Sequence, residues 1–178
     1  MSNDRSLFAD LDPGTFDAEP ARIVPFPGRM PERLVGVGFR CWLAGFETGD
    51  ITSWEEAWNT YQEPLGAEAA KPLILSLSQF VRAVKATASR DIQRYPASAR
   101  GFCRDECLAI SVIAACQHDA RSALCTCAAA LIGSNDIGDT LSGAQDFACA
   151  LKAADQILSA SSICAANCPL MTPRGRLQ

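Results

Sequence analysis

Hydrophobic residues recur every three or four positions along most of this chain, which is the period of an α-helix. The first clear stripe consists of Val35, Phe39, Trp42 and Phe46, which follow one another at intervals of four, three and four residues. Residues with this spacing share one face of a helix, so the pattern predicts a helix with a buried face over about 32–47. No segment shows the strict alternation of polar and apolar residues that a half-buried strand requires.

Capping and breaker residues divide the following sequence into five further helical segments. Ser53 and Glu56 have the spacing of a capping box, which predicts that a second helix begins at Ser53 and ends near Pro64. The remaining helices are predicted over about 72–88, 104–117, 120–132 and 140–161. The helix over 104–117 is apolar nearly all round, which is typical of a central helix. These patterns predict an all-α fold, a single-domain bundle of five or six helices.

The two ends of the chain lack a sustained hydrophobic period. Residues 1–29 contain four prolines and several acidic residues, a composition that predicts a flexible, disordered tail. The helical bundle is expected over residues 30–168, and residues 169–178 are expected to form a frayed C-terminal tail.

The N-terminal tail contains hydrophobic residues spaced among acids, including Phe8, Leu11 and Phe16. Such a pattern is typical of short motifs that become ordered on the surface of a partner protein. A solvated arm without any binding role would produce the same pattern.

Charge and hydropathy exclude several classes of partner. The net charge is −4 at pH 7, the sequence pI is about 5.0, and the basic residues are scattered singly. A chain without clustered Lys and Arg cannot neutralise many phosphates, so nucleic acid is not an expected partner. The chain opens without an export signal, and no apolar run reaches the ~18–20 residues that span a membrane. We therefore expect a cytoplasmic protein that does not enter the membrane.

Two pairs of cysteines have a spacing that suits a metal site. Cys103 and Cys107, in "CRDEC", and Cys164 and Cys168, in "CAANC", are each four residues apart and therefore share a helix face. If the two faces met, four thiolates would surround a tetrahedral zinc ion, an iron–sulfur cluster or copper(I). The spacing of the two pairs resembles that of copper storage proteins, which are helical bundles lined by Cys-x-x-x-Cys pairs. The resemblance is confined to these pairs and to helical character, because those proteins carry denser cysteines with histidine beside them.

The nine cysteines of the chain are also compatible with two roles that need no metal. A free cysteine behaves as a small hydrophobic residue and is among the most frequently buried residue types. Packing in the core is therefore the simplest role, especially beside the alanine-rich stretches of this chain. A redox role is the second, with an exposed pair that oxidises to a disulfide.

All three tryptophans, Trp42, Trp54 and Trp58, fall within 17 positions. Tryptophan is enriched at the centre of protein interfaces, so these residues are candidates for a partner-binding surface. Alternatively, they pack the second helix on the first and close one end of the bundle, which is the interpretation that we favour.

The chain shows no catalytic motif. The single histidine, His118, is expected at a helix end, and no local sequence pairs it with a nucleophile. By elimination, the sequence favours a regulatory or adaptor module that acts by binding a protein partner, and it leaves homodimerisation through the apolar helices open. A thiolate metal or iron–sulfur protein and a thiol redox sensor are the alternative functions.

Overall fold

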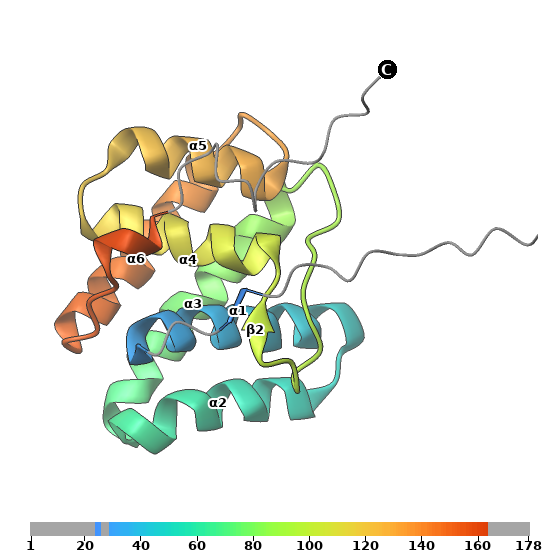
Figure 1. Cartoon of the computed structure of the whole chain (residues 1–178). Helices are drawn as coiled ribbons and strands as arrows, with labels where there is room; N and C mark the ends of the chain where they lie inside the picture. The colour runs from blue at the N-terminus through green and yellow to red at the C-terminus, as the bar shows by residue number, and fades with distance from the viewer. Residues whose placement is uncertain (1–23, 26–28, 164–178) are drawn as a thin grey trace, which may run out of the picture.

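The computed structural model describes residues 24–25 and 29–163, and most of these residues lie in α-helices (Figure 1). The helices of this part of the chain are α1 (Met30–Thr48), α2 (Ile51–Leu65), α3 (Ala67–Thr87), α4 (Arg104–Gln117), α5 (Arg121–Ile132) and α6 (Gly138–Ala153). Two short strands, β1 (Val24–Pro25) and β2 (Gly101–Phe102), pair antiparallel, and a 3-10 turn, η1 (Ala160–Ser162), follows α6. The predicted all-α bundle is confirmed.

Helix α4 lies at the centre of the bundle and packs against α1, α5 and α6 (Figure 1). Leu108, Val112 and Ile113 are among its many buried residues, as the apolar sequence of this helix predicts. Helix α3 packs along α6, where the rings of Phe80 and Phe147 stack with their centroids 6.3 Å apart. One continuous core therefore joins all six helices of the described chain.

Helices α1 and α2 form an antiparallel hairpin joined by Gly49 and Asp50 (Figure 1). Gly49 ends α1 in the left-handed conformation, with φ of 70°. The Asp50 carboxylate accepts a hydrogen bond from the Thr52 amide at 3.0 Å and so caps α2, which begins at Ile51. The predicted start at Ser53 is wrong, because Asp50 provides an N-cap earlier in the chain.

Two other predicted helix boundaries are also wrong. Helix α3 begins at Ala67, because strong helix formers follow Gly66 directly, and Pro72 lies inside the helix. Helix α6 ends at Ala153, well before the predicted end near residue 161.

Helix α6 ends where Asp155 adopts a positive φ of 57° and the Gln156 amide donates to the Leu151 carbonyl at 2.8 Å. A side chain of α4 then holds the segment that follows. Gln117 Nε2 donates to the Gln156 carbonyl at 3.0 Å, and Gln117 Oε1 accepts from the Leu158 amide at 2.8 Å. Leu158 is buried by this arrangement although it lies outside any helix. The hydrophobic stripe therefore predicts correctly that Leu158 is buried, but it predicts wrongly that the helix continues to this residue.

A buried carboxylate attaches the end of the described chain to α1. Glu32 Oε1 accepts hydrogen bonds from the Ser159 amide at 2.7 Å and from the Ser162 hydroxyl at 2.9 Å. The Ser162 carbonyl in turn accepts from the Ser111 hydroxyl of α4 at 2.9 Å. The turn η1 is thereby held against both α1 and α4.

Glycines on α1 allow α2 to approach closely. A Cβ at Gly45 would overlap the indole of Trp54, and a Cβ at Gly38 would crowd the phenol of Tyr61. The buried Tyr61 hydroxyl donates to the Leu34 carbonyl at 2.8 Å. The distance between the two helices is therefore set by a missing side chain at two positions of α1.

We predict that Gly45→Ala lowers the free energy of unfolding by about 1–3 kcal/mol, because the added methyl group must displace the packed indole of Trp54. Urea denaturation followed by circular dichroism measures the loss. Gly138→Ala is the matched control, since a Cβ there meets nothing within 4 Å and alanine favours the helix. Equal stability of the two variants would contradict the close approach of α1 and α2.

Candidate functional site

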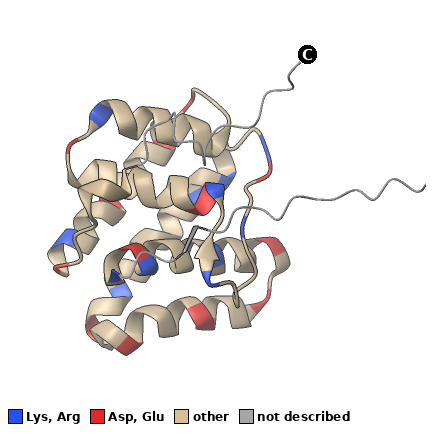
Figure 2. Ribbon diagram, viewed as in Figure 1, with Lys and Arg blue, Asp and Glu red and all other residues tan. Residues whose placement is uncertain are grey.

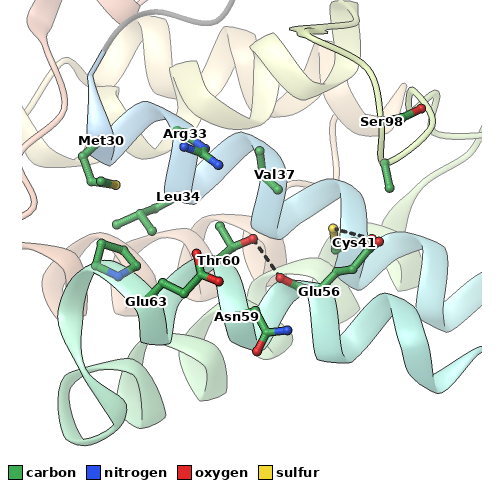
Figure 3. Close-up of a pocket in the computed structure, with 12 residues that line it drawn as sticks. Met30, Arg33, Leu34, Val37, Cys41, Glu56, Asn59, Thr60, Glu63 and Ser98 are labelled. Atoms are coloured by element: carbon green, nitrogen blue, oxygen red, sulfur yellow. Dashed lines mark hydrogen bonds between the residues drawn. The ribbon is translucent and has the colours of Figure 1, made fainter.

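A groove of about 810 Å³ runs between α1 and α2 (Figure 3). Its α1 wall is formed mainly by Met30, Leu34, Val37 and Cys41, at intervals of four, three and four residues. This spacing places the four side chains on one face of α1, along about three turns of the helix. The wall is therefore largely apolar, with Arg33 as its charged lining residue, and it ends at a thiol.

The opposite wall of the groove is polar. Glu56, Asn59, Thr60 and Glu63 follow one another on one face of α2 at intervals of three, one and three residues (Figure 3). The Thr60 hydroxyl donates to the Glu56 carbonyl at 2.8 Å, so the hydroxyl bonds within its own helix. Neither glutamate forms an ion pair within the described part of the chain.

The third side of the groove is a loop, and a buried arginine of α1 holds that loop in place. Ala97 and Ser98 line the groove, and the neighbouring carbonyls of Pro96 and Ala99 accept hydrogen bonds from Arg40 Nη1 at 3.3 and 3.1 Å. Arg40 Nη2 also donates to the Gly101 carbonyl. One guanidinium thus fixes the backbone on both sides of the two lining residues.

A buried carboxylate of α4 neutralises the same guanidinium. Glu106 accepts from Arg40 Nε at 2.7 Å and from Arg40 Nη2 at 2.9 Å, and the two side chains are 1% and 0% exposed. Glu106 also accepts from the backbone amides of Tyr95 at 3.0 Å and Cys103 at 2.8 Å. A charged pair at this depth is sustained only when its remaining hydrogen-bonding groups are satisfied, and here both carboxylate oxygens have partners.

A second ion pair holds the beginning of the same loop. Asp105 accepts from Arg90 Nη1 and Nη2, each at 2.7 Å, and from the Gln93 amide at 2.7 Å. Arg90 is only about one-third exposed and pairs with this buried acid. The adjacent acids at the start of α4 therefore hold the connection between α3 and α4 from two sides.

Sequence reasoning missed Arg40, Glu106 and Arg90 as a group. The available signal was a single arginine inside the apolar run "GFRCWLAG", since a charge on a buried face requires a partner. The partners of these charged residues lie far away in sequence, and a hydrophobic pattern does not reveal such pairings.

Cys41 lies at the meeting point of the groove and a smaller hollow of about 230 Å³ that leads toward Thr48 and Arg94. Its sulfur donates a long hydrogen bond to Glu56 Oε2 at 3.8 Å (Figure 3). Burial, and then the charge of Glu56, raise the pKa of the Cys41 thiol to about 12. The thiol is therefore protonated at neutral pH and acts as a neutral donor.

The cysteines of the predicted metal site are only partly placed. Cys103 is buried at the N-cap of α4, where its thiol donates to the Gln93 carbonyl at 3.2 Å. Burial, and then the charge of Glu106, raise the pKa of this thiol to about 11, which disfavours a thiolate. Cys107 is partly buried and packs against the core. Cys164 and Cys168 lie outside the described residues, so the four-cysteine site stays a prediction.

Within the described part of the chain, no group of three or more His, Cys, Asp or Glu side chains is arranged to hold a metal ion. Cys41, Cys103, Cys116, Cys125 and Cys149 are free thiols. Cys116 has its pKa raised to about 11, first by burial and then by the nearby Cys149. His118 lies at the end of α4, where its Nε2 atom is 2.8 Å from the Leu158 carbonyl.

The tryptophans pack α2 on α1, as the favoured interpretation predicts. The rings of Trp42 and Trp54 lie 6.3 Å apart, and each also contacts Phe46, at 6.4 and 6.3 Å. The indole nitrogens of Trp42 and Trp54 are buried and have no hydrogen-bond partner among the residues that the structure describes. Trp58 packs against the core and, like the other two, does not line the groove.

The other candidate partner-binding residues, Phe8, Leu11 and Phe16, lie outside the described residues. Their role stays a prediction. The described helices include none that is long and apolar enough to cross a membrane.

Comparisons with known proteins do not assign the groove a function. No protein-family model, no curated protein and no solved structure matches this chain. The case for a function therefore depends on the geometry and chemistry of the groove itself.

We predict that Glu106→Ala lowers the free energy of unfolding by about 3–5 kcal/mol, because it leaves the Arg40 guanidinium buried without a counter-charge. Urea denaturation measures the change. Glu68→Ala is the control: it removes an ion pair with Lys71 in which both side chains are largely exposed, and it should change stability by less than about 1 kcal/mol. Equally small losses in the two variants would rule out a stabilising role for the buried pair.

We also predict that Cys41 is protonated at neutral pH and reacts only through its small thiolate fraction. Since its pKa is raised to about 12, its rate of modification should climb about tenfold per pH unit through pH 10 without a plateau. Glu56→Gln should lower the pKa and increase the rate at a given pH, whereas Glu55→Gln, on the solvent side of α2, should not. Mass spectrometry of the peptide that contains Cys41, after timed treatment with a small methanethiosulfonate, measures the rates. A plateau below pH 9 in the unmodified chain would contradict the raised pKa.

Proposed function

We propose that this protein acts by binding, as a regulatory or adaptor module, and that the groove between α1 and α2 receives a segment of a partner protein. The observation that carries the proposal is the pairing of an apolar wall with a polar wall whose charged groups have no ion-pair partner in the described chain. A segment with one apolar and one polar face would satisfy both walls at once.

The dimensions of the groove support this proposal. Its volume of about 810 Å³ falls within the ~300–1,000 Å³ that ligand sites in proteins occupy. The groove follows two helices side by side and is open to solvent along its length, a shape that suits a chain segment better than an enclosed small molecule (Figure 3). The buried pair of Arg40 and Glu106 supports a rigid third wall, which reduces the entropy lost on binding.

The chemistry of Cys41 supports binding over nucleophilic catalysis at this site. A nucleophilic cysteine needs an accessible thiolate, whereas burial, and then the charge of Glu56, raise the pKa of Cys41. The only histidine of the chain, His118, caps the C-terminal end of α4 and contacts the Leu158 carbonyl.

A cytoplasmic location is part of this proposal. Cys41, Cys103, Cys116, Cys125 and Cys149 are free thiols, which is typical of proteins in reducing compartments. The hydrophobic residues of the N-terminal segment, Phe8, Leu11 and Phe16, are proposed as a second contact with the partner.

A displayed library of short random peptides, selected on the full chain, tests the proposal. Asn59→Trp should lower the affinity of the selected peptides by about tenfold or more, because an indole at this exposed position fills the groove. Gln62→Trp places the same ring three residues further along α2, outside the groove lining, and should leave affinity within about twofold. If Asn59→Trp leaves the affinity of the selected peptides unchanged, the groove is not the binding site.

A further inference from the structure

The groove has an excess of negative charge on one side only. Helix α2 carries Glu55, Glu56 and Glu63 and no Lys or Arg (Figure 2). Glu56 and Glu63 face the groove, and both are exposed. They are seven residues apart, which corresponds to a rise of about 10 Å along the helix. Two carboxylates at that separation cannot share one metal ion, but they can each pair with a cation of a larger ligand.

The position of Glu63 is unfavourable for the helix itself. It lies in the last turn of α2, where a negative charge opposes the helix dipole, and that turn contains no basic residue. No ion pair within the described chain compensates it. The stability of α2 therefore gives no reason for an acid at this position, whereas a cationic ligand in the groove does.

We propose that the occupant of the groove is an amphipathic helical segment of another protein, with two basic residues about two turns apart beside an apolar stripe. Its basic residues pair with Glu56 and Glu63, and its apolar stripe packs on Val37 and Met30 of α1. This inference rests on the proposed function and names the chemistry of the partner at the same groove.

Arg33 determines which way the occupant faces. It is the only Lys or Arg among the described residues that line the groove, and it stands on α1 beside Met30 (Figure 3). Its charge repels a ligand whose basic residues face α1. The basic stripe of the occupant is thereby directed to the α2 side, where the two glutamates lie.

Two designed helical peptides test the proposal on the full chain by fluorescence anisotropy. They share a leucine stripe and differ only in two positions seven residues apart, which are Lys in one peptide and Glu in the other. The Lys peptide should bind about tenfold more tightly at low salt, since two exposed ion pairs are gained and two repulsions are absent. The preference should shrink as salt approaches about 0.3 M. Equal affinity of the two peptides at low salt would overturn the proposal.

A charge reversal in the groove provides the decisive control. The double variant E56K/E63K should prefer the Glu peptide, which a purely structural defect would not produce. The variant E55K/E68K changes the net charge by the same amount at exposed positions outside the groove, so it should still prefer the Lys peptide. If E55K/E68K reverses the preference as well, net charge alone explains it and the proposal fails.

The outcomes separate this inference from the proposed function. One outcome is that the affinity of the library peptides falls in Asn59→Trp although the peptides are not basic and E56K/E63K leaves their affinity unchanged. In that case the groove binds a partner of another chemistry, and only this inference fails. If no peptide depends on Asn59, the proposed function fails as well.

Two other occupants are distinguished by further measurements. A dimer in sedimentation equilibrium that E56K/E63K dissociates would identify a second copy as the occupant and would overturn the proposal. A synthetic peptide of residues 164–178 contains Arg174 and Arg176 and no acid. If it displaces the Lys peptide and binds more tightly, the occupant is a segment of this chain, which would also overturn the proposal.

Discussion

The buried pair of Arg40 and Glu106 is the interaction on which the arrangement of this protein depends most. It joins the first helix to the central one across 66 residues of sequence, and both side chains are almost fully excluded from water. The same guanidinium orders the backbone around residues 96–101, and the same carboxylate accepts amides on both sides of that segment. A loop that would otherwise be free becomes the third wall of the groove between α1 and α2.

The helical fold could be predicted from sequence because the periodic burial of side chains on helices is encoded locally. The central position of α4 follows from residues such as Val112 and Ile113 on every side of it. The hydrophobic stripe does not reveal the end of α6, because it continues to the buried Leu158 although Asp155 turns the backbone to a positive φ. Gln117, a distant residue, then holds the segment that follows. The prediction places the start of α2 at Ser53, which is wrong for a local reason. Asp50 also has a side chain suited to an N-cap, and it caps the helix earlier in the chain.

The groove is even less visible in the sequence. Its walls combine a stripe of α1 with a stripe of α2, and which faces of two helices turn outward depends on how both pack on the rest of the core. Tryptophan suggests a binding surface, yet Trp42 and Trp54 join α1 to α2. Cysteine suggests metal binding, yet Cys41 and Cys103 are buried, protonated thiols. These tryptophans and cysteines pack inside the protein, whereas residues without a distinctive sequence signal, such as Asn59, line the groove.

The occupant that we propose for the groove between α1 and α2 is an amphipathic basic helix. Backbone amide chemical shifts of the full chain, recorded by NMR during titration with the Lys peptide, test this proposal most directly. The shifts should change along the groove faces of α1 and α2 and around Ala97 and Ser98, while those of the amides of α5 and α6 stay unchanged. Changes centred on α5 and α6, or saturation without any change along α1 and α2, would contradict it.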